Sequence, residues 1–207
     1  MLELYKENLA RVFTAATSEE VEAGKVWYAK ASELALTVAA EYDLTVEVVA
    51  GVIAALSPQV SWEQQVKSTA TFVAWVKDHL KWGGEDLFHV KDVEKAPHAG
   101  TYTNKVKAAN ILLTGDVKRF LKGPKVEVFC KNMLGFEDEC TLDSWAIRAV
   151  TLNPLAHEGQ ARNKAGQAMR LAYQELAKDV GLTTAQFQAV VWLAFRARHA
   201  QIIGGQA

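Results

Sequence analysis

The chain has 207 residues, half of them apolar, which is enough for one large domain or two small, closely packed domains with a proper core. It carries 23 Lys and Arg against 24 Asp and Glu, and this net charge of −1 argues against tight non-specific binding to a phosphate backbone while leaving room for a local basic face. The two cysteines, Cys130 and Cys140, form no CxxC pair. A four-thiolate zinc site and an iron–sulfur cluster are therefore excluded.

Other features indicate a cytoplasmic protein without a cofactor or a membrane partner. The N-terminal stretch MLELYKENLARVF has the pattern of an amphipathic helix rather than of a signal peptide, and no apolar run is long enough to cross a membrane. The histidines show no paired metal-ligand spacing, so we expect no bound metal. Surface or capping roles are expected for all five of them, His79, His89, His98, His157 and His199.

In chain order, the predicted elements are all helical, about nine or ten in number, with no convincing strand. A first apolar stripe at helical spacing contains Trp27, Ala31, Leu34 and Val38. The run VEVVAGVIAALSPQ is apolar nearly all round and predicts a central buried helix. That helix ends at Ser57-Pro58, because the residue before a proline leaves the helical region. A further helix is predicted from about Trp62 to Lys81, followed by a loop over residues 83–101.

The second half of the chain continues in helices. One is predicted from about Asn104 to Leu113, and residues 117–135 form two short helical pieces broken by Gly123-Pro124. The last helix begins at Thr183, where Thr183 and Gln186 have the pattern of a capping box. Two apolar stripes belong to these final helices, the first with Met169, Ala172, Tyr173, Leu176 and Val180 and the second with Phe187, Val191 and Phe195.

Three stretches carry candidate chemistry, and the first is LSPQVSWEQQ over residues 56–65. The end of the buried helix presents Ser57, Gln59 and Trp62 in one turn, where polar and aromatic side chains are able to contact a ligand. A polar corner between two helices explains the same residues without any function. Both interpretations stay open from the sequence.

The second stretch is LKGPKVEVFCKN over residues 121–132. Gly123-Pro124 makes a tight turn that feeds a helix N-terminus, and the free N–H groups of such a turn suit a phosphate. Lys125 stands at the start of this helix, where the helix dipole disfavours a cation, although a solvated lysine needs no further reason. Between Lys105 and Lys131 there are seven basic residues against two acidic ones, so this neutral chain contains one basic region.

The third stretch is TLDSWAIR over residues 141–148, where Asp143 precedes a helical pattern. Asp143 as an N-cap of that helix needs no further explanation. The capping role does not exclude chemistry, because amide donors at a helix N-terminus favour the ionised carboxylate. Such a carboxylate suits the stabilisation of positive charge.

The order and spacing of these stretches resemble the helix-hairpin-helix (HhH-GPD) DNA glycosylases of the endonuclease III type. LSPQ is similar to the family's LSxQ segment, and GTYTNKVKAANIL over residues 100–112 resembles its GxYxxKAxxI helix. LKGPK resembles a shortened hairpin LPGVGxK, LDSWAIR resembles VDTHxxR, and residues 187–199 are similar to the closing helix. The family's separation of hairpin lysine and aspartate equals that between Lys125 and Asp143. The likeness covers roughly residues 45–199.

The resemblance implies a role for each matching residue. Asp143 would face the sugar of a flipped nucleotide and stabilise the charge that develops as the base leaves, and Lys125 would attack C1′ and form a Schiff base that permits strand cleavage. Gln59 would fill the gap left by the extruded base. The residues implied beside the base are Ser57, Trp62 and Trp145, and those expected against DNA phosphates are Gly123, Lys105, Lys122 and Lys131.

The chain departs from the family at several positions. The hairpin lacks two residues and keeps one glycine, Gly123, and Trp145 stands where the family usually has His. The cysteines that bind an iron–sulfur cluster in many relatives are missing. A compact chain with a pared-down hairpin is similar to divergent members found in phage genomes, some of which act on modified thymines in phage DNA. Location in the host cytoplasm follows if the chain is phage-encoded.

The resemblance also implies one compact all-α unit over residues 1–207 with two closely packed subdomains. A helical bundle over about residues 25–120 would carry Gln59, and residues 1–24 with 121–207 would carry the hairpin and Asp143. The leading hypothesis is a DNA glycosylase-like enzyme, with or without AP-lyase activity, whose partner is DNA. The alternatives are a catalytically inactive helix-hairpin-helix DNA-binding module and a phage interaction protein that reuses the fold.

Overall fold

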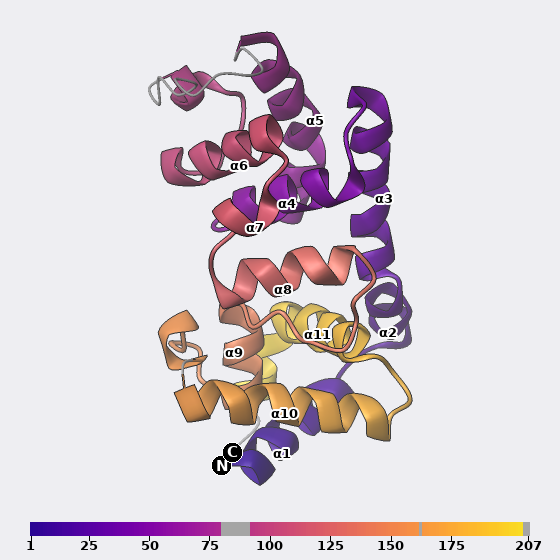
Figure 1. Cartoon of the computed structure of the whole chain (residues 1–207). Coiled ribbons are helices and arrows are strands. Elements are labelled where there is room, and N and C mark those ends of the chain that lie inside the picture. The colour runs from indigo at the N-terminus through magenta and orange to yellow at the C-terminus, as the bar shows by residue number, and fades with distance from the viewer. Residues whose placement is uncertain (80–91, 162, 205–207) are drawn as a thin grey trace. The chain divides into compact units, whose positions relative to one another are not determined.

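The computed structural model of the chain describes residues 1–79, 92–161 and 163–204, and in these residues it is built from helices without a strand (Figure 1). The predicted all-α class is confirmed. Eleven α-helices and two short 3-10 helices are present in the described part, against the nine or ten helices expected. The difference arises from short helices such as α2 (Ser18–Lys25) and α7 (Val117–Phe120), since a helix of so few residues shows almost no periodicity.

The helices divide between two compact units. Unit 1 comprises Met1–Lys30 and Gly135–Ala207, and unit 2 comprises Ala31–Leu134. The hairpin segment after residue 120 was predicted to share a subdomain with Asp143. Asp143 belongs to unit 1, but residues 121–134 belong to unit 2. They do so because α8 (Pro124–Met133) packs against α4 (Val46–Leu56).

Unit 2 is organised around α4. Every residue of α4 from Val48 to Leu56 is buried, which confirms the predicted central helix. Thr45 caps its N-terminus by accepting the Val48 N–H, and Ser57 forms its C-cap. The helix ends where predicted, but Ser57 does not leave the helical region before Pro58 as expected, since its φ is −67° and its ψ is −27°. The surrounding helices are α5 (Trp62–His79), α6 (Tyr102–Thr114), α7 and α8, with the 3-10 helix η1 (Asp92–Lys95) against α6.

The predicted break at Gly123-Pro124 is confirmed, since α7 ends before it and α8 begins at Pro124. The predicted helix at 104–113 extends over Tyr102–Thr114, because Thr101 accepts the Asn104 N–H and so starts the helix earlier. Lys81, His89 and residues 83–91 of the predicted loop lie outside the described residues, and the described remainder, residues 92–101, includes η1.

Unit 1 is organised around α11 (Thr184–Gly204), which packs against α1 (Leu2–Thr14), α2, α9 (Ser144–Thr151) and α10 (Asn163–Asp179). The capping box at Thr183 and Gln186 is present in both directions, which confirms the predicted start of this helix. The predicted stripe of α11 lies in the core, with Phe187, Val191 and Phe195. The stripe of α10 is buried through Met169, Ala172 and Tyr173, whereas Val180 at its end is exposed.

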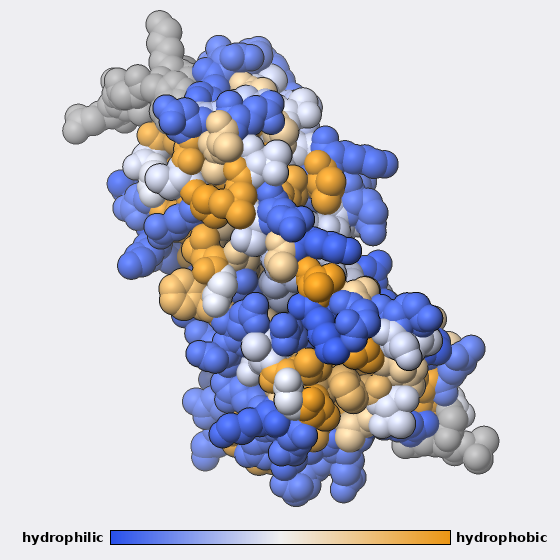
Figure 2. Space-filling view, turned by 90° about the vertical axis from the view of Figure 1, so that its right-hand side faces the viewer, coloured by the Kyte–Doolittle hydropathy of each residue, from blue (hydrophilic) through white to orange (hydrophobic). Residues whose placement is uncertain are grey.

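Two elements complete the described helices, α3 (Trp27–Tyr42), whose first residues belong to unit 1, and η2 (Glu158–Ala161). On the face shown in Figure 2, hydrophilic residues predominate and hydrophobic residues form small groups between them. Within the described ranges, no helix combines the length and the apolarity that a membrane crossing requires.

Close contact between α2 and α11 yields a test of the packing in unit 1. A Cβ added at Gly24 would come within 2.7 Å of the Val190 backbone nitrogen and 2.8 Å of its Cα. Gly24→Ala should therefore destabilise the protein by about 2 kcal/mol in a urea titration, although alanine in a helix otherwise stabilises by about 0.5–1 kcal/mol. Gly204→Ala, which meets nothing within 4 Å, is the matched control. A gain of stability in Gly24→Ala would contradict the close approach.

Candidate functional site

Asp143 is fixed by hydrogen bonds from two helices of unit 1. It is the N-cap of α9, where its Oδ1 accepts the Ala146 N–H at 2.7 Å, and the predicted capping role is confirmed. Its Oδ2 accepts the indole N–H of Trp192, on α11, at 3.2 Å. The side chain is half-buried. Donors to both oxygens fix the position of the carboxylate and favour its ionised form.

Two tyrosines and a cysteine that interact electrostatically with Asp143 are buried and neutral. The buried Tyr28 hydroxyl donates to Gln188 Oε1 at 2.8 Å, and burial raises the pKa of Tyr28, with a smaller contribution from the charge of Asp143. Burial likewise raises the pKa of Tyr173 and raises the pKa of the Cys140 thiol to about 12. These phenols and this thiol stay protonated at neutral pH, so none of them supplies a competing negative charge.

Two indoles and two guanidinium groups gather beside Asp143, and we call Trp145, Arg148, Trp192 and Arg196 the Trp–Arg surface. The Arg196 guanidinium carbon lies 4.4 Å from the ring centre of Trp192 and 5.8 Å from that of Trp145. The Arg148 guanidinium carbon lies 5.2 Å from the ring centre of Trp145. These distances are those of cation–π contacts. Trp145 also packs edge-on against Phe195 in the core.

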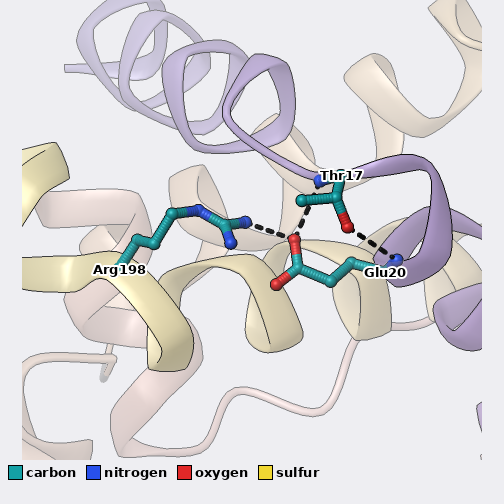
Figure 3. Close-up of polar contacts among 3 residues, drawn as sticks. All are labelled: Thr17, Glu20 and Arg198. Carbon is teal, nitrogen blue, oxygen red and sulfur yellow. Dashed lines mark hydrogen bonds and ion pairs between the residues drawn. The ribbon is translucent and has the colours of Figure 1, made fainter.

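The end of α11 is redirected at Arg198, whose backbone has φ −136° and ψ 21° inside the helix. Figure 3 shows that the Arg198 guanidinium and the Thr17 backbone N–H meet the same carboxylate oxygen of Glu20. Burial raises the pKa of Glu20, but the hydrogen bonds from Arg198 and Thr17 leave it lowered overall. This ion pair joins α2 to α11, two helices that are far apart in the sequence.

The kink in α11 also places His199 beside Trp145, with 5.6 Å between the ring centres. Two buried nitrogens near the kink, Arg198 Nε and His199 Nδ1, have no hydrogen-bond partner among the described residues. A buried polar atom without a partner is uncommon in a folded protein.

In unit 2, Ser57, Gln59 and Trp62 share the turn between α4 and α5, as predicted. The Ser57 hydroxyl donates to the Ala54 carbonyl at 2.9 Å, so it serves the end of α4. Gln59 is exposed and has a positive φ of 66°, which is uncommon for a residue other than glycine. Trp62 is the half-buried first residue of α5.

The predicted hairpin differs from a phosphate-binding loop at Gly123. Its φ of 136° is the conformation that glycine tolerates, but its N–H donates to Glu127 Oε1 at 2.9 Å. The amide expected to hold a phosphate is thus occupied by a carboxylate of the same helix, which corrects the prediction for Gly123. Lys122 and Lys131 are exposed, and Lys125 is half-buried in the first turn of α8.

Lys105 was predicted to contact a DNA phosphate, and the structure contradicts this. The residue is 8% exposed, and its Nζ donates to the Ala96 carbonyl at 2.7 Å and to the Glu94 carbonyl at 3.1 Å. Burial lowers the pKa of Lys105. Its ammonium group holds η1 and the residue after it against α6 and is not presented to a ligand.

Unit 2 contains a buried polar network that was not predicted from the sequence. His98 is 9% exposed rather than on the surface, its Nδ1 accepts the Gly100 N–H at 2.9 Å, and its Nε2 lies 3.3 Å from Gln65 Oε1. The Thr69 hydroxyl lies 3.3 Å from the same Gln65 oxygen. Gln65 and Thr69 share the buried face of α5 with Phe72 and Val76, so polar residues on an apolar stripe were the available signal.

The predicted site residues therefore fall into two groups. Asp143 and Trp145 belong to unit 1 and lie in one cluster, whereas Ser57, Gln59 and Lys125 belong to unit 2. Among residues 1–79, 92–161 and 163–204, no group of three or more His, Cys, Asp or Glu side chains is placed to hold a metal ion.

Comparisons with known proteins give one match. The profile of a family described as "Family of unknown function (DUF7178)" matches residues 1–199. No curated protein and no solved structure matches the chain.

His98 generates a prediction about pH. Burial and the nearby Lys105 ammonium lower the pKa of His98 to about 4, whereas an unfolded histidine titrates near 6.5. Above about pH 6.5 the contribution of the neutral imidazole to stability is fully present, and between about pH 6.5 and 4 it is lost, because the unfolded chain binds the proton first. The stability advantage of the parent over His98→Gln should thus shrink as pH falls in urea titrations.

The exposed His157 supplies the control for that experiment. His157→Gln should keep the pH dependence of the parent protein. If the parent and His98→Gln lose stability in parallel below about pH 6.5, the buried neutral state of His98 is refuted.

Proposed function

The chain belongs to DUF7178, a family of unknown function, and we propose that it is a DNA glycosylase-like enzyme that cleaves or exchanges the N-glycosidic bond of a flipped base. The observation that carries the proposal is the Asp143 carboxylate, held half-buried by the Ala146 and Trp192 N–H groups. The resemblance of LSPQ, LKGPK and LDSWAIR to the helix-hairpin-helix glycosylases supplies the reaction class. Action in the cytoplasm, of a host cell if the chain is phage-encoded, is part of the same proposal.

The proposed reaction makes a specific demand on Asp143. As the bond from C1′ to the base breaks, the base takes the electron pair and positive charge develops on the sugar, as in glycoside hydrolysis. A preorganised carboxylate stabilises this charge without reorganising at the moment of reaction. Water, or the incoming group of an exchange, then attacks C1′ and gives up its proton. The two N–H donors fix the carboxylate, and a fixed charge is what this role requires.

The base must first leave the stack, at a cost of a few kcal/mol. We assign Gln59 to the space that the base vacates, because the strained turn at this residue presents an exposed side chain, and Ser57 and Trp62 of the same turn are assigned to the flipped base. Trp145 is assigned to the flipped nucleotide through its place in the cluster of Asp143. Lys122 and Lys131 are assigned to DNA phosphates, since both are exposed lysines of the basic region.

Lys125 is assigned the role of a nucleophile in an AP-lyase step. Its neutral amine would attack C1′ as the base departs with the electron pair of the broken bond and takes up the proton that the amine loses. Cleavage of the C1′–O4′ bond, with O4′ protonated, would then give the imine that permits strand cleavage. The position of Lys125 in the first turn of α8, which is unfavourable for a cation, supports a functional reason for this residue.

A second candidate function is a catalytically inactive DNA-binding module or an interaction protein of the phage. It is favoured by the hydrogen bonds of Asp143, because an N-cap that also accepts an indole N–H is sufficiently explained by stability alone.

Asp143→Asn separates the two candidates. Asparagine keeps the cap through its single carbonyl oxygen but turns its NH2 group toward the Trp192 indole N–H, so a loss of about 1–3 kcal/mol is expected, and folding of the variant is checked by thermal unfolding. Base release from a panel of single-stranded and duplex DNA with uracil or 5-hydroxymethyluracil should fall by about 100-fold or more, because the negative charge is lost. Asp116→Asn, the same exchange at the N-cap of α7, is the matched control. A parent and variants that bind DNA but are equally inert would establish the binding module.

Lys125→Ala tests the covalent step. With borohydride and DNA that contains an abasic site, the parent should give a reduced covalent adduct that Lys125→Ala does not give, because only an imine is trapped in this way. Lys178→Ala, on an exposed lysine of α10 that is assigned no role in the reaction, should retain the adduct. Base release by the parent without any adduct would assign the reaction to Asp143 alone and remove Lys125 from it.

A further inference from the structure

The arginines of the Trp–Arg surface keep their hydrogen-bonding edges available. A planar guanidinium over an aromatic ring uses its face, and its N–H donors at the edge are not consumed. Arg196 is exposed, and none of the hydrogen bonds of the described residues uses its N–H groups. Arg148 uses only Nε, which donates to the Ala156 carbonyl at 3.1 Å, so its terminal nitrogens remain available.

These two guanidinium groups also have no carboxylate to neutralise them. Within the described part of the chain, neither Arg148 nor Arg196 forms an ion pair with an acidic side chain. Arg198, two residues further along α11, differs because Glu20 neutralises it. The Trp–Arg surface thus presents two guanidinium groups without an ion pair beside one carboxylate, Asp143, in a chain whose net charge is −1.

Indoles alternate with these charges. Arg148 and Arg196 both lie over Trp145, and Arg196 lies over Trp192 as well, so the two cations are interleaved with two large π-surfaces. The contacts with Phe195 and Asp143 hold the indoles in place. A ligand that fits this pattern carries negative charges separated by flat, unpaired rings.

We infer that the Trp–Arg surface binds a single-stranded segment of DNA next to Asp143, with bases stacked on the guanidinium–indole pairs at Trp145 and Trp192 and phosphates on the N–H edges of Arg148 and Arg196. Single-stranded nucleic acid is bound elsewhere by the same combination of aromatic platforms and cations. The identification of the ligand as DNA rests on the proposed function, whereas the pattern of charges and rings does not.

A single strand fits this surface better than a duplex does. Stacking requires a base whose face is exposed, and the bases of a duplex present only their edges. An acidic peptide would satisfy the guanidinium groups and leave the indoles without partners. With Trp145 at the flipped nucleotide, the neighbouring nucleotide at Trp192 and the phosphates at Arg148 and Arg196 become part of the recognised substrate.

The test measures binding separately from base release. Fluorescence anisotropy of a labelled oligothymidylate, and of its duplex with oligodeoxyadenylate, is followed over a series of salt concentrations. Arg196→Gln should weaken binding of the single strand about 5- to 10-fold and reduce the salt slope by about 0.7, the value for one phosphate contact on a single strand. Arg196→Lys, which keeps the charge and loses the planar fork, should weaken it less.

Trp145→Leu should weaken binding of the oligothymidylate about 10-fold through lost stacking. Because this change also removes packing against Phe195, its thermal unfolding is compared with that of the parent, and Arg196→Gln, at an exposed position, keeps the test decisive if Trp145→Leu does not fold. Lys178→Gln, an exposed charge of α10 in the same unit, is the matched control and should bind like the parent.

The outcomes separate this inference from the proposed function. Weaker binding in Arg196→Gln supports the inference even if the parent releases no base, in which case the glycosylase proposal fails alone. Unchanged binding of the oligothymidylate in Arg196→Gln overturns the inference even if Asp143→Asn abolishes base release, and leaves the surface to a protein partner. Tighter binding of the duplex than of the single strand also overturns it.

Discussion

The arrangement of unit 1 depends on one carboxylate held between two N–H groups. Asp143 receives the Ala146 amide and the Trp192 indole, so it starts α9 and ties that helix to α11. The cap contributes about 1 kcal/mol, and hydrogen bonds to a charged group contribute about 1.5–3 kcal/mol each. Trp192 in turn carries the Arg196 guanidinium over its ring. One acidic side chain therefore orients a helix start, an indole and a cation, which is why the candidate chemistry and the local stability cannot be assigned to separate residues.

The second constraint in unit 1 is the close approach of α2 and α11. Gly24 provides the space beside Val190, and the Glu20 carboxylate meets Arg198 where α11 is redirected. The redirection lets Ile202 enter the core and sets His199 beside Trp145. The kink thus completes the aromatic surroundings of the Trp–Arg surface and at the same time leaves two nitrogens, on Arg198 and His199, without partners. Such a cost is acceptable in a folded protein when the buried apolar area that it permits is larger.

Local physics made much of the fold predictable. The burial of α4, the break at Gly123-Pro124 and the Thr183 capping box each depend on residues within a few positions of one another, and all three are confirmed. Three contacts were not predictable, because each joins segments that are separate in the sequence. They are the hydrogen bonds from Lys105 Nζ to two carbonyls, the contact of the buried His98 with Gln65, and the hydrogen bond from Trp192 to Asp143. Asp143 was identified from its spacing, while the partner that fixes its second oxygen comes from a position 49 residues away.

Counting charges along the chain gave a misleading picture of where an anion would bind. The basic region from Lys105 to Lys131 is dense in sequence, yet Lys105 is consumed inside unit 2 and the Gly123 amide is occupied by Glu127. Arg148 and Arg196 are 48 positions apart and form no cluster in the sequence, yet they share the ring of Trp145 and lack acidic partners within the described residues. What decides anion binding is the number of guanidinium or ammonium groups left unneutralised at one place in space. By that measure Lys105 is removed from the predicted basic region, and Arg148 with Arg196 adds a second positively charged place, even though the chain as a whole is nearly neutral.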